Sequence, residues 1–133
     1  MKLAPLLSEH PPALRFVLVG VVPALFGAIC GWLLGVNEVA YLVLSILAIL
    51  GGYGAGLDHL GAREGAVRGF VGGALFGSFI LIVHELTGEE AEAHLPEPAI
   101  LLVVITTVLG VLLGALGGRH RARVEARAGT PPA

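Results

Sequence analysis

Charged side chains are scarce in this chain and absent from four long stretches of it. Asp, Glu, Lys and Arg make up 14% of the 133 residues, whereas a soluble domain averages about 25%. Hydrophobic residues reach 56%, and the mean hydropathy is +0.88. The four uncharged stretches are Phe16–Val36, Val39–Leu57, Gly69–Val83 and Ala99–Gly118. Only Asn37 and Glu38 separate the first stretch from the second. This composition excludes an ordinary soluble domain.

The sequence also lacks the residues that several kinds of chemistry require. Cys30 is the only cysteine, so an intrachain disulfide and a cysteine zinc cluster are excluded, and Cys30 is interpreted as a small packing residue. We find no nucleophile–base pair, phosphate loop or metal motif, and no carboxylate at mid-membrane depth. We therefore expect no enzyme, no metal or other cofactor, and no proton-coupled carrier. The net charge of −2 and the few aromatics argue against nucleic-acid binding.

The uncharged stretches have the length of membrane spans, which need about 17–25 mostly apolar residues. We predict an all-α membrane protein with four transmembrane helices in a single domain, residues 1–118, followed by a basic and partly disordered tail, residues 119–133. The third span reaches full length if His84 and Glu85 lie near the interface. The expected spans are approximately 14–36, 39–57, 66–86 and 98–118.

The basic residues predict an orientation. All of them fall in the N-terminal arm, the second loop or the tail, and these three segments lie on one side of a four-span protein. The positive-inside rule then places both termini in the cytoplasm. The preference for Arg over Lys favours a bacterial inner membrane. Four tail arginines are expected to contact anionic lipid headgroups, at about 1 kcal/mol per residue. The basic residues are Lys2, Arg15, Arg63, Arg68, Arg119, Arg121, Arg123 and Arg127.

Small residues recur at four-residue spacing in every apolar stretch, a pattern that lets helices pack closely in lipid. We expect a glycine-zipper packing in which these glycines form the helix contacts. Further glycines, among them Gly51 and Gly54, suggest surplus small surface for a homo-oligomer or another membrane protein. The predicted packing residues are Gly27, Gly31, Gly35, Gly52, Gly56, Gly65, Gly69, Gly73, Gly77, Gly110, Gly114 and Gly118.

A weak internal repeat suggests two tandem helix pairs. The motif ALFG occurs at Ala24–Gly27 and at Ala74–Gly77, and Leu42–Gly51 aligns with Leu101–Gly110. Two spans per unit give both copies the same orientation, as in a parallel repeat. Apolar sequence of low complexity also produces such matches by chance, so both readings stay open.

Few polar side chains lie within the expected spans. Hydroxyls in helices usually bond their own backbone; the alternative is a pore lined by Ser45, Ser78, Thr106 and Thr107. His84 and Glu85 are candidates for a pore mouth, where the surrounding acidic residues would raise the local cation concentration.

Two further features lie in the first helix and the second loop. Pro23 should kink the first helix and free the carbonyl of Val19, either for packing or to offer it to an ion. The second loop, Asp58–Arg68, carries interspersed charges. We interpret this loop as a solvated turn with local ion pairs; the alternative is a gating or docking loop.

Two families of small membrane proteins were compared with these motifs. The segment Gly69–Phe79 resembles the third-helix Gly-Phe-x-Gly-Gly segment of the small fluoride channels. That family continues with a Thr-rich run, which Ala74, Leu75 and Gly77 replace here, and its polar residues on helices one and two have no counterpart. Small multidrug exporters need a glutamate in the first span, and Phe16–Val36 has none. Neither family is assigned.

Two functional hypotheses follow from these observations. The first is a homo-oligomeric channel or passive transport protein for ions or small solutes. The second is a non-catalytic scaffold or subunit that packs against a partner membrane protein.

Overall fold

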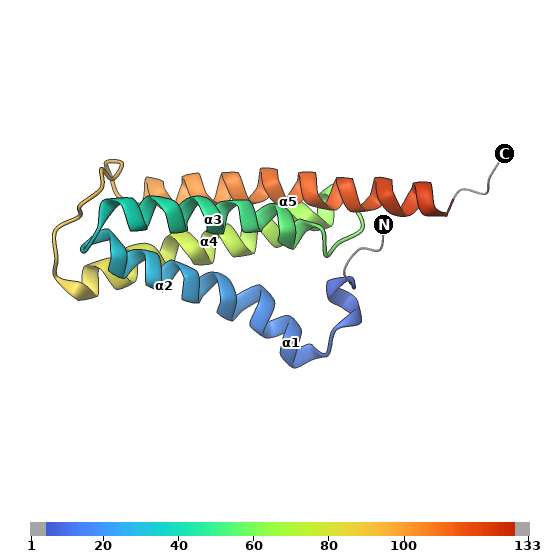
Figure 1. The fold of residues 1–133 in the computed structure, drawn as a ribbon, viewed down its shortest axis with the longest axis horizontal. Helices are drawn as coiled ribbons and strands as arrows, with labels where there is room; N and C mark the ends of the chain where they lie inside the picture. Colours follow the sequence, from blue (N-terminus) through green and yellow to red (C-terminus); the bar gives the residue numbers. More distant parts are fainter. Residues whose placement is uncertain (1–4, 130–133) are drawn as a thin grey trace.

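The computed structural model describes residues 5–129, and all regular structure in this part of the chain is helical (Figure 1). Lys2 and the last four residues of the predicted tail lie outside the described range. Four helical segments are long and apolar enough to cross a membrane, which makes this a multi-pass membrane protein. The elements are η1 (Leu7–Glu9), α1 (Pro12–Phe16), the π-helical η2 (Val17–Val21), α2 (Val22–Leu34), α3 (Glu38–Gly56), α4 (Ala62–Thr87) and α5 (Leu101–Ala128).

The helix ends follow local sequence signals. Asn37 caps α3, because its side-chain oxygen accepts a hydrogen bond from the Ala40 amide at 3.0 Å. Gly88 ends α4 in the left-handed conformation at φ 70°, which glycine adopts without a Cβ penalty. The last helix continues to Ala128, so the first part of the predicted tail is helical. Segments α1, η2 and α2 run on as one 23-residue span from Pro12 to Leu34.

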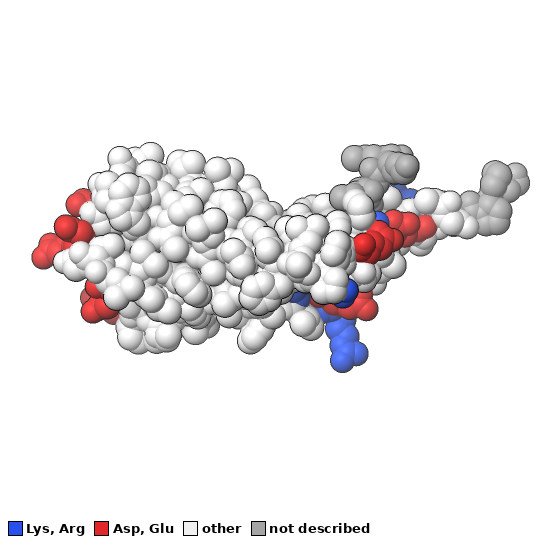
Figure 2. Space-filling view, turned by 90° about the horizontal axis from the view of Figure 1, so that it is seen from below, with Lys and Arg blue, Asp and Glu red and all other residues white. Residues whose placement is uncertain are grey.

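The two ends of the bundle differ in charge. The acidic end comprises the α2–α3 turn and the 88–100 segment, and in Figure 2 its charged side chains are all Asp or Glu. The arginine end comprises the turn at 57–61 and the ends of the described chain, and it shows charges of both signs.

Helix α4 contacts the other three long helices, and it lies closest to α5. A Cβ on Gly69 would collide with the carbonyl oxygen of Gly110, and the reverse also holds. Gly65 and Gly114 form a second reciprocal pair of this kind. These backbones approach more closely than any residue with a side chain would allow.

Helix α2 also packs on α4, through Gly27 and Gly31. A Cβ on either glycine would meet a backbone carbonyl of α4, that of Phe76 or Ile80. Both contacts lie toward the acidic end. Toward the arginine end the first helix leans away from the other three, as Figure 1 shows. The close contact at one end and the divergence at the other give the bundle a wedge shape.

Most predicted packing glycines lie against another segment of the same chain. Gly52 makes only an ordinary contact, 3.8 Å from Leu113 Cβ to an added Cβ, and Gly35 faces Glu89 of the 88–100 segment. The surplus glycines Gly51 and Gly54 on α3 face open space. Tight approaches occur at Gly27, Gly31, Gly35, Gly56, Gly65, Gly69, Gly73, Gly77, Gly110, Gly114 and Gly118.

The proposed repeat stays a prediction. Its alignment matches Gly51 with Gly110, yet an added Cβ would find nothing within 4 Å at Gly51 and would strike the Gly69 carbonyl at Gly110. Positions matched by the alignment therefore pack differently.

A small apolar cluster closes the acidic end of the bundle. Leu34 and Ile80 are almost completely buried in it, and the 88–100 segment adds Ala93. The Glu92 amide donates a 2.7 Å hydrogen bond to the Leu34 carbonyl, which ties that segment over the end of α2. The cluster comprises Cys30, Leu34, Tyr41, Phe76, Ile80 and Ala93.

Replacing Gly69 by alanine should destabilise the bundle, because the new methyl group meets a backbone carbonyl that cannot rotate away. We expect the free energy of unfolding to fall by about 1–3 kcal/mol, the usual cost of overpacking. Gly51→Ala is the matched control, and it should be neutral or slightly stabilising because alanine is the better helix former. Unfolding in detergent, followed by circular dichroism, measures both; equal effects would contradict the assigned contact.

Candidate functional site

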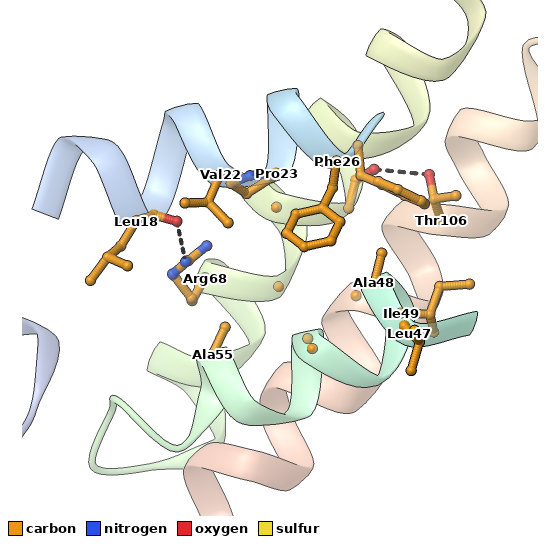
Figure 3. Close-up of a pocket in the computed structure, with 17 residues that line it drawn as sticks. Leu18, Val22, Pro23, Phe26, Leu47, Ala48, Ile49, Ala55, Arg68 and Thr106 are labelled. Carbon is orange, nitrogen blue, oxygen red and sulfur yellow. Dashed lines mark hydrogen bonds between the residues drawn. The ribbon is translucent and has the colours of Figure 1, made fainter. Parts of the chain in front are cut away.

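A cavity of about 170 Å³ lies where the first helix leans away from the bundle (Figure 3). Its volume is sufficient for several water molecules. All four membrane-spanning helices contribute to its wall, which is apolar except at Arg68 and Thr106. Lining side chains include Leu18, Val22, Pro23, Phe26, Ala48, Ala55, Arg68, Phe76 and Thr106, and glycines of α3, α4 and α5 complete the wall.

Arg68 is the charged residue of this cavity. It is the seventh residue of α4, about two turns in, and only 8% of it is exposed. Its Nη2 donates a 2.7 Å hydrogen bond to the Leu18 carbonyl across the wedge, and its Nε is buried without a hydrogen-bond partner (Figure 3). Among residues 5–129, no carboxylate forms an ion pair with this guanidinium. A buried cation without a counter-charge is costly, and in membrane helices such residues are usually functional.

The first helix provides the acceptor for Arg68 through its π-helical turn. In π geometry a carbonyl pairs with the amide five residues later, which for Leu18 is Pro23, a residue without an N–H. The guanidinium takes the place of that missing donor. The expectation that Pro23 frees the Val19 carbonyl stays a prediction. It did not anticipate the π turn at Val17–Val21, which leaves the Leu18 carbonyl without a backbone donor.

Glycines make room for the guanidinium. A Cβ on Gly72 would lie 3.4 Å from Arg68 Nη1 and 3.8 Å from Pro23 Cγ. A larger residue at position 72 would occupy the space between α4 and the first helix. The small residues of α4 thus serve close packing on one face and a polar side chain on another.

A second, more open hollow of about 430 Å³ lies at the arginine end, between η1, η2 and α4. Arg68 also lines this hollow, so one side chain borders both spaces. Two arginines and one glutamate line it, with His59 beside them. The remaining lining residues are Leu7, Val19, Val67 and Val71.

The turn at 57–61 is held in place on two sides and is half-buried. The Leu7 amide donates to the Asp58 carbonyl at 2.9 Å, and the Gly61 amide donates to the Gly118 carbonyl at 3.1 Å. Arg121 Nη1 donates to the Leu57 carbonyl at 3.1 Å. This packing corrects the interpretation of the whole loop as a solvated turn.

Burial affects the two titratable groups of this turn. It raises the pKa of the Asp58 carboxyl above its usual value, although the nearby charge of Arg68 acts in the opposite direction. Burial, reinforced by Arg68, lowers the pKa of the His59 imidazole, whose Nε2 is buried without a partner. His59 is therefore neutral at neutral pH.

The predicted polar residues do not converge on one axis within the chain. Thr106 lines the cavity and is 4% exposed; its Oγ1 lies 2.8 Å from the Gly73 carbonyl on α4 and 3.1 Å from the Val103 carbonyl. Thr107 bonds the Val103 carbonyl of its own helix at 2.6 Å. Ser45 donates to the Cys30 sulfur at 3.8 Å, and Ser78 lies half-buried on α4.

His84 and Glu85 lie at the acidic end, away from Arg68. Glu85 is exposed, whereas the Nδ1 of His84 is buried without a hydrogen-bond partner. A Cβ on Gly35 would lie 3.7 Å from the His84 ring. Their role at a pore mouth stays a prediction.

One of the four tail arginines differs from the others. Arg121 is buried, forms a 2.8 Å ion pair with Glu125 and bonds the Leu57 carbonyl, so its charge is directed into the protein. Arg119, Arg123 and Arg127 are exposed, and lipid headgroup contacts stay a prediction for them.

The importance of Arg68 was not recognised from the sequence, which assigned it to a charged loop. One signal was present: Arg68 lies inside the third predicted span and is surrounded by Gly65, Gly69 and Gly72. Small neighbours at these spacings leave space around a long side chain. The partner carbonyl, fifty residues earlier, was not recognisable from the sequence.

Together these features define a class: a four-span membrane protein with an arginine-containing cavity between its helices. No family model, curated protein or solved structure matches the chain. Its function is therefore inferred from the residues themselves.

Replacing Thr106 by valine should weaken the α4–α5 contact, because the hydroxyl joins the two helices through the Gly73 carbonyl. Interhelical hydrogen bonds in membrane proteins contribute about 0.6 kcal/mol on average and at most about 1.7. Thr107→Val is the matched control, since Thr107 bonds only its own helix, and it should have almost no effect. Unfolding in detergent compares the two; an equal loss from both variants would refute the distinction.

His59 should make folding stability depend on pH. The folded protein holds the His59 pKa below the unfolded value of about 6.5, so below that pH the unfolded chain binds a proton that the folded chain does not. Stability should fall as the pH falls through this window. The raised pKa of Asp58 makes stability depend on pH in the opposite direction, but Asp58 is present in both wild type and His59→Gln, so its contribution cancels in the comparison. The melting temperature of His59→Gln should therefore rise relative to wild type below about pH 6.5; parallel pH profiles would be inconsistent with this assignment.

Proposed function

We propose that this protein is a passive transport protein for ions or small solutes, with its path along the wedge between the first helix and the rest of the bundle. One observation carries the proposal: Arg68 borders both the hollow at the arginine end and the cavity between the helices. A polar side chain at the junction of two spaces suits a conduction path better than a purely structural contact, which would seal the junction with apolar residues.

The path is closed toward the acidic end. Phe76 belongs both to the cavity wall and to the apolar cluster around Leu34 and Ile80. Apolar constrictions close pathways by excluding water. Transport therefore requires this cluster to open, with the 88–100 segment above it moving or the helices separating at Gly27 and Gly31.

The first helix is the element best suited to move. Its π-helical turn and Pro23 interrupt the regular backbone pairing, and such turns are frequent at functional sites. Its tightest contacts with α4 lie near one end, while at the other end Arg68 spans the gap. Release of the Leu18 carbonyl by Arg68 would remove the hydrogen bond that joins α4 to the first helix at that end.

A homo-oligomer is part of this proposal. Within the apolar 18-residue segment of each helix, 11% is buried in α3, against 22–28% in the other three. Gly54 faces open space on α3 outside the cavity, which offers a close-packing surface to a second copy. Glycine-zipper packing is thus proposed both within the chain and between copies.

A second candidate function is a scaffold that packs against a different membrane protein, and the same open surface of α3 favours it. The two differ in what the purified protein does alone. A scaffold conducts nothing and is recovered from native membranes with one stoichiometric partner, whereas a transport protein conducts without a partner.

Filling the cavity should abolish flux. Ala55 lines the cavity near Arg68, so Ala55→Phe places a ring in the path, and flux from liposomes loaded with potassium salts or small neutral solutes should fall to the level of protein-free liposomes. The control is Val108→Phe on α5, at a position that is 51% exposed and outside the cavity, and it should conduct like wild type. Absence of flux for every solute through the wild-type protein would overturn the proposal.

A further inference from the structure

The charge balance at Arg68 points to the kind of solute. The guanidinium is 8% exposed and has one neutral acceptor, the Leu18 carbonyl. Its Nε–H is buried without a partner. Within residues 5–129 no carboxylate pairs with it; Asp58 acts on it only at longer range. The site therefore has an unused donor and a positive charge with no carboxylate in contact with it.

We infer that Arg68 binds a small anion in the cavity, through its Nε–H and the positive charge of its guanidinium. This inference deepens the proposed transport function and rests on it for its physiological role. An anion would supply both the missing acceptor and a counter-charge in direct contact, whereas water would supply only the acceptor. Guanidinium groups suit this role because they bind carboxylates and phosphates with several N–H donors and stay charged when buried.

The approach from the arginine end has the same charge preference. Arg63 and Arg68 line the open hollow against the single carboxylate Glu64, so its lining has an excess of one positive charge when His59 is neutral. An excess of positive charge around a hollow raises the local anion concentration and lowers that of cations. The end at which every charged side chain is acidic, which would favour cations, is the opposite one (Figure 2).

The remaining cavity wall suits a small, poorly hydrated or partly hydrated ion. It contains no carboxylate, and its other side-chain polar atom, Thr106 Oγ1, is directed to backbone carbonyls. A halide, nitrate or short carboxylate fits a cavity of about 170 Å³. A lipid phosphate entering from the open hollow offers the same chemistry, so free anions and headgroups must be separated by experiment.

The test measures chloride binding to the purified full-length protein in detergent, by broadening of the chloride NMR line. R68Q should weaken binding by about tenfold or more, the range of a lost charge-assisted hydrogen bond. R119Q is the matched control: it removes an exposed arginine outside both spaces and should bind like wild type. Equal broadening in all three proteins, or none in wild type, would overturn the inference.

Two additions keep the test decisive. If R68Q does not fold, R68K replaces it: lysine keeps the charge but lacks the Nε–H fork, and unchanged binding would overturn the assignment to that donor. In wild type, the melting temperature should be higher in chloride than in gluconate at the same ionic strength, because a bound anion stabilises the folded state. Equal melting temperatures would count against a bound chloride.

A lipid arm identifies the source of the anion. Added phosphatidylglycerol, compared with phosphatidylcholine, should leave chloride binding unchanged if the site takes a free anion; selective displacement by phosphatidylglycerol would assign the same site to a headgroup phosphate. Flux separates this inference from the transport proposal. Cation flux without chloride binding would overturn the anion site alone, whereas Arg68-dependent binding without any flux would overturn transport alone.

Discussion

The close approach of helix backbones at glycines is the constraint on which the rest of this structure depends. In lipid there is no hydrophobic force between helices, so van der Waals contacts between closely packed helices must supply the attraction. Gly69 against Gly110, and Gly27 against the Phe76 carbonyl, place the backbones at separations that no side chain permits. These contacts hold α5 along α4 and hold the first helix against α4 near the acidic end. The divergence of the first helix at the other end follows from them.

The wedge created by this divergence determines where a charge can reside. Arg68 extends from α4 into the space that Gly72 leaves open and reaches the Leu18 carbonyl. That carbonyl is available because Pro23 and the π-helical turn remove its backbone donor. The two irregularities thus compensate each other. The first helix has a carbonyl without a backbone N–H donor, and the buried guanidinium of Arg68 donates a hydrogen bond to it. The compensation is incomplete, since the Nε of Arg68 remains unpaired. Arg68 therefore connects the structure with the proposed function.

Much of the architecture could be predicted from the sequence, because hydropathy over about twenty residues is a local property. The four spans, the cap at Asn37 and the end of α4 at Gly88 follow from nearby residues. The candidate site was less accessible. Thr106 was selected for its depth, whereas Arg68 was assigned to a loop by its charge and its neighbours in sequence. The acceptor role of the Leu18 carbonyl was not anticipated, because π-helical geometry is not encoded in an obvious pattern.

By itself, the sequence determined that this chain is a multi-pass membrane protein and that its helices can pack closely, because apolar length and small-residue spacing act within single helices. Only the tertiary structure decided which glycines meet another backbone and which face open space. It also decided that Arg68 is buried beside a carbonyl fifty residues earlier, and that Arg121 points inward while Arg119 is exposed. These outcomes depend on the angle at which helices cross, which is set by contacts between residues distant in sequence.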